Sequence, residues 1–201
     1  MHKHFIAATA VAASLAGCAT TRIDAQWRNI DMPANYLRGA TVLVSCETGE
    51  EVLRHICEDE ISADLAARGV HPVLAAPGTV AVMQPGVSDM QYLPAARDNG
   101  AKAVFSVTVG LNSQRVSEGL TIGVGGFGFG RNVAGGVGVS APIGGGEVSS
   151  GYAANGRVTD VASGRLMWTA RASTPPSSDV NAQLTDLSKS VLDAAGTSGL
   201  F

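Results

Sequence analysis

The sequence predicts one α+β domain with a mixed sheet, two main helices and a long Gly-rich β-hairpin or loop. Three observations lead to this class: short apolar, β-branched runs spread along the chain, two long segments with helical apolar spacing, and an insertion at 119–146 in which 12 of 28 residues are glycine. The 201 residues are enough for a leader and one domain with a sizeable core. We therefore divide the chain into residues 1–17, 18–38 and 39–201.

Residues 1–17 have the pattern of a signal peptide. A basic start precedes an apolar run over residues 5–15, which is shorter than the roughly 20 residues of a membrane-spanning helix. The run ends in Leu-Ala-Gly17-Cys18, a bacterial lipobox. We therefore expect cleavage between Gly17 and Cys18, with diacylglycerol and fatty acyl groups attached to the Cys18 thiol. The alternative is a secreted protein in which Cys18 has no such role.

The residue after Cys18 indicates the destination. It is Ala19, whereas an Asp at this position retains lipoproteins at the inner membrane of enteric bacteria. We expect the protein on the periplasmic face of the outer membrane, held by its lipid. Residues 18–38 are polar apart from Trp27 and are expected to form a lipidated tether that docks late on the periplasmic domain.

The first predicted elements of the domain are a strand and a helix. Residues 41–46 form a β-branched run of the length of a buried strand. Thr48 and Glu51 have the spacing of a capping box, and helical apolar spacing follows until Gly69, which is expected to end the helix.

The middle of the domain continues this alternation. Residues 70–75 are predicted to form a second strand, and Pro72 indicates that it lies at an edge or starts late. Residues 77–91 are expected to be mostly loop, and a short helix is expected from Pro94 to Gly100. The valine-rich run 103–111 is a third strand.

The C-terminal part is predicted to be a hairpin followed by a helix. Strands 152–161 and 165–172 are joined by a turn at Ala162-Ser163-Gly164. An apolar stripe then begins near Ser178 or Asp179 and is expected to end at Gly196.

The Gly-rich insertion, 119–146, alternates apolar residues with glycine on both sides of Arg131-Asn132, which predicts a hairpin with its turn there. Gly123, Gly125 and Gly128 match a nucleotide-binding pattern, but no helix follows to hold a phosphate. A second interpretation is a membrane-crossing hairpin of an oligomeric barrel, since each arm reaches about 9–11 residues. A third is an extension lying on its own domain or on a partner. Phe127 and Phe129 are the candidate membrane or partner contacts.

Cys46 and Cys57 are the cysteines that remain besides Cys18. In an oxidising compartment they can form a disulfide, although an ideal strand-loop-helix could hold their Cα atoms beyond the roughly 7 Å bridging limit. Two buried free thiols are the alternative. A metal site that adds His55 would lack a fourth ligand and matches no zinc spacing, so no metal site is predicted.

Catalysis is not expected from this sequence, and no catalytic residue is assigned. His55 and His71 are the mature histidines, and both are expected at the surface or in capping roles. A serine-nucleophile elbow and a zinc-protease motif are both lacking. No cofactor is expected beyond the acyl groups on Cys18. The net charge of −3 and the lack of a basic cluster argue against nucleic-acid binding.

The chain also resembles a known family. Besides the lipobox, the segments that carry the resemblance are 26–28, 41–46, 54–65, 100–104 and 160–168. Together they resemble a family of uncharacterised Gram-negative outer-membrane lipoproteins with an anticodon-binding-like α/β domain. The layout is similar to domains of the curli-secretion lipoprotein, the lipoprotein activator of penicillin-binding proteins, and the TolB N-terminal domain.

The resemblance implies a periplasmic scaffold that binds another envelope protein, and it supplies no active-site residue. The expected function is therefore structural or partner-binding, without catalysis. The alternative is a subunit of an oligomeric secretion-type pore that inserts the hairpin 119–146 into the membrane.

Overall fold

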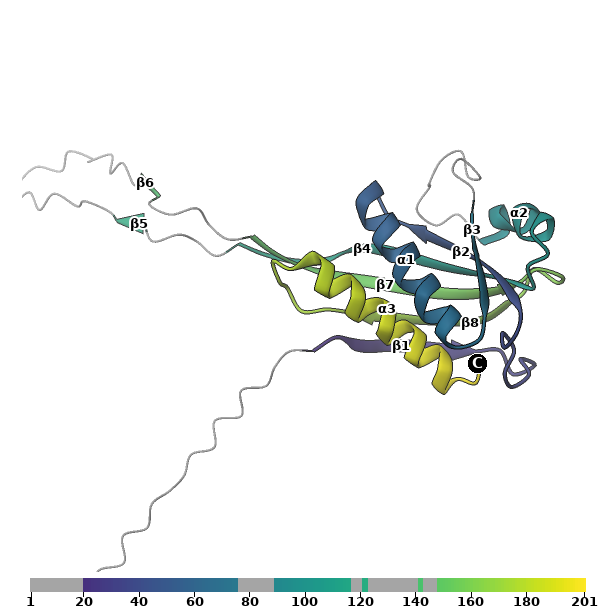
Figure 1. The fold of residues 1–201 in the computed structure, drawn as a ribbon. Helices are drawn as coiled ribbons and strands as arrows, with labels where there is room; N and C mark the ends of the chain where they lie inside the picture. The colour runs from purple at the N-terminus through teal and green to yellow at the C-terminus, as the bar shows by residue number, and fades with distance from the viewer. Residues whose placement is uncertain (1–19, 76–88, 117–120, 123–140, 143–147) are drawn as a thin grey trace, which may run out of the picture.

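The computed structural model describes residues 20–75, 89–116, 121–122, 141–142 and 148–201. They form a six-stranded mixed sheet with two long helices on one face (Figure 1). The order of the strands is β1-β8-β7-β4-β2-β3. The predicted α+β domain with a mixed sheet is confirmed.

The strands are β1 (Arg22–Arg28), β2 (Thr41–Glu47), β3 (His71–Leu74), β4 (Ala103–Val116), β5 (Thr121–Ile122), β6 (Ala141–Pro142), β7 (Val148–Asp160) and β8 (Leu166–Ser173). The helices are α1 (Glu51–Ala67), the 3-10 turn η1 (Asp89–Tyr92), α2 (Leu93–Asp98) and α3 (Val180–Thr197). Strand β2 runs parallel to both β3 and β4, and the other neighbours in the sheet are antiparallel. β3 is an edge strand, as Pro72 predicts.

The main core lies between the sheet and the two long helices. Trp168 of β8 and Phe105 of β4 are fully buried there, with their ring centroids 6.2 Å apart. Gly156 of β7 makes room for this packing, because a Cβ at that position would come within 2.5 Å of Val191 and 3.4 Å of the indole. A smaller cluster around Leu43 and Tyr92 lies on the opposite face under η1 and α2. Burial raises the pKa of the Tyr92 phenol to about 12.

The N-terminal segment differs from the expectation. Residues 22–28 were expected in the tether, but they form β1, which pairs antiparallel with β8. Residues 29–38 also belong to the domain, since Met32, Tyr36 and Leu37 are buried. The Tyr36 hydroxyl donates a hydrogen bond to the Asp160 carboxylate. Burial by itself would raise the pKa of Asp160, but the hydrogen bonds from Tyr36 and Ser163 outweigh it and lower that pKa. Long-range pairing to β8 gives this polar segment its structure.

Two predictions about helix ends are wrong. The N-cap of α1 is Glu50 without a side-chain capping bond, so Thr48 and Glu51 do not form a capping box. Helix α3 continues past Gly196 to Thr197, and the glycine with positive φ that follows it is Gly199 (φ +80°). Gly196 instead allows close packing, since a Cβ there would lie 3.1 Å from the Arg68 guanidinium. The other two ends agree with the prediction. Gly69 follows α1 with φ +79°, and the Asp179 carboxylate accepts from the Ala182 amide at the start of α3.

Strands β4 and β7 are longer than expected, and they lead into the Gly-rich insertion. Their pairing continues out to Val116 opposite Val148. Beyond it, β5 pairs antiparallel with β6, so that Thr121 lies opposite Pro142. In the residue numbering, paired Thr121 and Pro142 are equally far from the 131–132 step, where the sequence predicts the turn. The turn and most of the arms, including Phe127 and Phe129, lie outside the described residues.

Candidate functional site

One end of the sheet brings the start of the domain next to the Gly-rich insertion. We call it the proximal end, because β1 begins there at Arg22, four residues after Cys18. Arg22 pairs with Ser173, Ser173 with Ala153, and Ala153 with Gly110, so these four residues lie in one row across the sheet. Beyond this row only β4 and β7 continue, toward the left in Figure 1. The N-terminus of the domain and the insertion therefore leave the fold at the same end.

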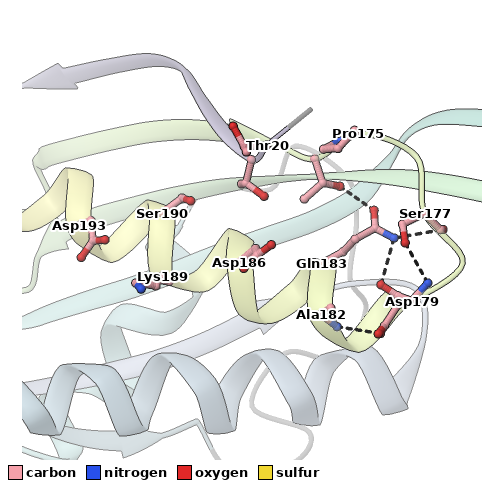
Figure 2. A pocket seen from close by; sticks show the side chains of 12 residues that line it. Thr20, Pro175, Ser177, Asp179, Ala182, Gln183, Asp186, Lys189, Ser190 and Asp193 are labelled. Carbon is pink, nitrogen blue, oxygen red and sulfur yellow. Dashed lines mark hydrogen bonds between the residues drawn. The ribbon is translucent and has the colours of Figure 1, made fainter. Parts of the chain in front are cut away.

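A polar groove of about 480 Å³ lies beside the start of β1 (Figure 2). Thr20 and Thr21 form one side, and the other side is the outward surface of α3 with Asp186, Lys189 and Asp193. Asp193 is engaged by Arg68 at 2.7 Å. The other polar side chains of the lining include hydroxyl and amide groups, which can donate and accept hydrogen bonds.

The loop that closes the groove is held by one buried amide. Gln183 is 5% exposed; its Oε1 accepts from the Thr174 hydroxyl at 2.6 Å, and its Nε2 donates to the carbonyls of Ser177 and Asp179. Ser177 in turn pairs with Ser150 of β7. The segment between β8 and α3 is thereby fixed against the extended part of β7.

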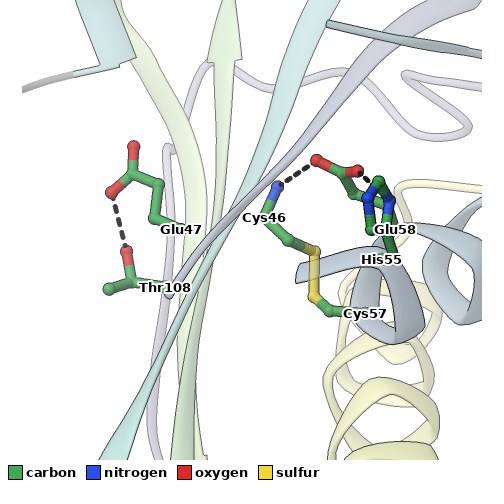
Figure 3. The surroundings of a disulfide bond; sticks show 6 residues. All are labelled: Cys46, Glu47, His55, Cys57, Glu58 and Thr108. Atoms are coloured by element: carbon green, nitrogen blue, oxygen red, sulfur yellow. Dashed lines mark hydrogen bonds and ion pairs between the residues drawn. A yellow bond between two sulfur atoms is a disulfide. The ribbon is translucent and has the colours of Figure 1, made fainter. Parts of the chain in front are cut away.

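Cys46 and Cys57 form a disulfide in the structure (Figure 3). Their Cα atoms are 6.1 Å apart, inside the bridging limit, because α1 begins close enough to the end of β2. Both cysteines are buried in the main core. Glu58, one residue further along α1, accepts a 3.4 Å hydrogen bond from the Cys46 amide. The bridge fixes the first half of α1 to the sheet.

The two histidines among the described residues, His55 and His71, are both exposed. His55 lies on the exposed side of α1 between Glu51 and Glu58, at 3.7 and 3.9 Å. His71 is exposed at the start of β3. Among the described residues, no cluster of three or more His, Cys, Asp or Glu side chains could hold a metal ion.

A buried carboxylate that the sequence analysis did not single out lies on the other face of the sheet. Asp89 of η1 accepts from Ser106 and Thr159, each at 2.6 Å, and pairs with Arg157 at 2.9 Å. Because both carboxylate oxygens are occupied, its role is to fasten η1 to the sheet. No local pattern marks it, since its partners are 17 to 70 residues away in the sequence.

The predicted processing site and the candidate contact residues cannot be placed. Gly17, Cys18, Phe127 and Phe129 all lie outside the described residues. No helix within the described ranges has both the length and the apolar character needed to cross a membrane.

Comparisons with known proteins are informative about the fold. No protein-family model matches the chain, and no curated protein matches it. Among solved structures, the PelC dodecamer from Paraburkholderia phytofirmans is 18% identical, with a TM-score of 0.50 over 92% of this chain and 99% of that chain. The lipoprotein GNA1162 from Neisseria meningitidis is 17% identical, with a TM-score of 0.43 over 79% of this chain and 99% of that chain. The PelC likeness shows a shared fold, and the likeness to anticodon-binding-like domains stays a prediction.

Proposed function

We propose that this chain is a lipid-anchored protein of the periplasmic face of the outer membrane, with a structural or partner-binding role and no catalysis. The lipobox at Cys18 carries this proposal. The fold supports it, because β1 enters the sheet only four residues after Cys18. An acyl-modified Cys18 would therefore hold the whole domain at the bilayer surface, and two or three acyl chains make such anchoring stable.

The anchor is tested by changing Cys18→Ala in a Gram-negative host that is fed radiolabelled palmitate. We expect the label to disappear and the precursor to keep its signal peptide, because the thiol is the acceptor of diacylglycerol and processing follows that modification. Gel autoradiography and precursor size measure both effects. Continued labelling would overturn the assignment.

The matched control is Cys46→Ala with Cys57→Ala, which removes the other two cysteines. It should keep the label, because those sulfurs are buried in the domain core. Separating the membranes by density tests the destination: wild-type protein should band with the outer membrane, and Ala19→Asp should move it to the inner membrane of an enteric host. Wild-type protein in the inner-membrane band would contradict the outer-membrane location.

A second candidate function is an oligomeric pore subunit that inserts the segment 119–146. One observation favours it: β5 and β6 pair in line with the β4–β7 hairpin, and this hairpin leaves the domain at the proximal end, where the anchor would be. PelC is described as a dodecamer in its solved structure. Self-assembly of this chain would be consistent with the shared fold.

The pore is tested on the lipidated protein in detergent. A pore subunit should form a ring-sized particle by light scattering and conduct ions in a planar bilayer. Replacing residues 119–146 with a short turn should keep the particle and abolish conductance, because the six-stranded sheet does not include that segment. A monomer without conductance, in which protease cuts the segment 119–146 first, would contradict the pore function. Partner binding would then be the remaining proposal.

A further inference from the structure

The length of the tether limits how far the domain can stand from the membrane. Arg22 follows Cys18 by four Cα-to-Cα steps, and a fully extended chain spans at most about 3.6 Å per step, or about 14 Å in total. With the acyl chains of Cys18 in the leaflet, the start of β1 lies within this distance of the bilayer surface. This step depends on the lipid anchor proposed above.

The strands that continue past Arg22 are longer than this tether. Residues 111–116 of β4 extend beyond the row of Arg22 and Gly110, and at about 3.3 Å per residue they cover about 20 Å. Leu111, their first residue, is three strands away from Arg22, or about 14 Å at the usual spacing between strands. The two lengths together keep Leu111 within about 28 Å of the bilayer, and it lies at the surface when the row from Arg22 to Gly110 is parallel to the bilayer.

Two exposed apolar side chains lie on the strands at this end. Among the described residues, seven large hydrophobic side chains are exposed, and two of them lie on strands at the proximal end: Ile23 of β1 and Leu111 of β4. Leu111 is 58% exposed on β4, opposite Tyr152 of β7. Ile23 lies on β1, beside the exposed Arg22. Apolar side chains next to a basic residue suit the boundary between acyl chains and headgroup phosphates.

The charges of this end restrict the contact to the strands. Glu50 and Glu51 stand at the start of α1 and Asp179 at the start of α3, where the helix dipole favours a negative charge in water. Burying these carboxylates against lipid would be costly, so Val52, which follows Glu51 on α1, is not part of the contact. The corner formed by β1, β4 and β7 has no such cluster among its described side chains; Asp24 is paired with Arg22 and Arg171.

We propose that this corner of the proximal end rests on the bilayer, with Leu111 and Ile23 in contact with lipid. The exposed side chains of Leu111 and Ile23 are then covered by the same membrane in which the acyl chains of Cys18 are inserted. The distal end, where β4 begins at Ala103, stands clear of the surface. From Ala103 to Leu111, β4 rises by about 26 Å at 3.3 Å per residue, which separates the two ends well beyond the length of a side chain.

The test is a fluorescent label on the full-length lipidated protein in vesicles of phosphatidylethanolamine and phosphatidylglycerol. An environment-sensitive dye is attached to Leu111→Cys in one sample and to Asp98→Cys at the distal end in a matched sample. Both positions are exposed, so neither change should disturb folding. We expect blue-shifted emission and loss of most of the fluorescence with brominated lipids for the label at 111, and neither effect at 98.

The outcomes separate this inference from the proposed function. If the protein carries no acyl group and does not float with vesicles, the lipid anchor fails and the inference fails with it. If it floats but the label at 111 is not quenched, the anchor stands and the membrane contact is wrong. A blue shift at 111 that persists in detergent and resists brominated lipid would mean that a second protein copy covers Leu111, which also overturns the proposal.

Discussion

Changing Trp168→Ala is expected to lower the free energy of unfolding by about 3–5 kcal/mol, the usual cost of removing a large aromatic side chain from a core. Trp168 of β8 is fully buried in the core between the sheet and α3, where it packs against Phe105. Its indole nitrogen donates a hydrogen bond to the Ser198 hydroxyl at 3.0 Å. The site cannot easily collapse, because Gly156 beneath the indole has no side chain to fill the space. Urea denaturation followed by circular dichroism measures the loss, using the chain from Ala19 onward.

The protein provides its own control for this change. Trp27 is the only other tryptophan, and it lies 49% exposed on the edge strand β1. Trp27→Ala should cost at most about 1 kcal/mol, since half-exposed positions lose little packing. Circular dichroism is preferred to fluorescence because each variant removes one of the two tryptophans. Equal losses for the two variants would contradict the position of the core between the sheet and α3.

The elements that the sequence predicts well are those whose apolar pattern is local. The valine-rich runs at 41–46 and 103–111 are strands, and the apolar stripes before Gly69 and after Asp179 are helices. Their burial follows from their own residues, since one face of each helix and the centre of each strand are apolar. The α+β class follows from these elements alone.

The elements that the sequence analysis missed depend on distant partners. All seven residues of β1 are exposed, so no apolar pattern marks them, and the strand exists because β8 offers it an edge. Tyr36 is buried with its hydroxyl bonded to Asp160 and the Lys102 ammonium over its ring, and the next residue, Leu37, donates its amide to the Leu200 carbonyl. Contacts that join the two ends of the chain leave no periodic signal in either end.

The same distinction applies to the candidate site. Cys18 is recognised from four adjacent residues, so the sequence alone is enough to propose the anchor. That β1 and the Gly-rich insertion leave the fold at one end could not be predicted, because it requires the strand order and the direction of β1. The membrane contact proposed for Leu111 depends on combining these two observations.

Opening the disulfide between Cys46 and Cys57 is expected to lower the free energy of unfolding by about 3 kcal/mol, the chain-entropy value for a closed loop of this length. The cleanest measurement compares urea denaturation of the same chain with and without reductant, because no buried atom is then removed. The two sulfurs are buried, so the reductant reaches them as the chain unfolds, and unfolding must be followed to equilibrium.

The matched control is the chain with both Cys46→Ala and Cys57→Ala, whose denaturation midpoint should not respond to reductant at all. If the two thiols were free in the native protein, reductant would leave the wild-type midpoint unchanged as well. A drop in the wild-type midpoint toward that of the double variant therefore distinguishes a bridge from two buried thiols. The loss of stability should be greatest for α1, since the bridge ties its first half to β2. The loop between them contains Gly49, which increases the conformational entropy of the unfolded chain that the bridge restricts.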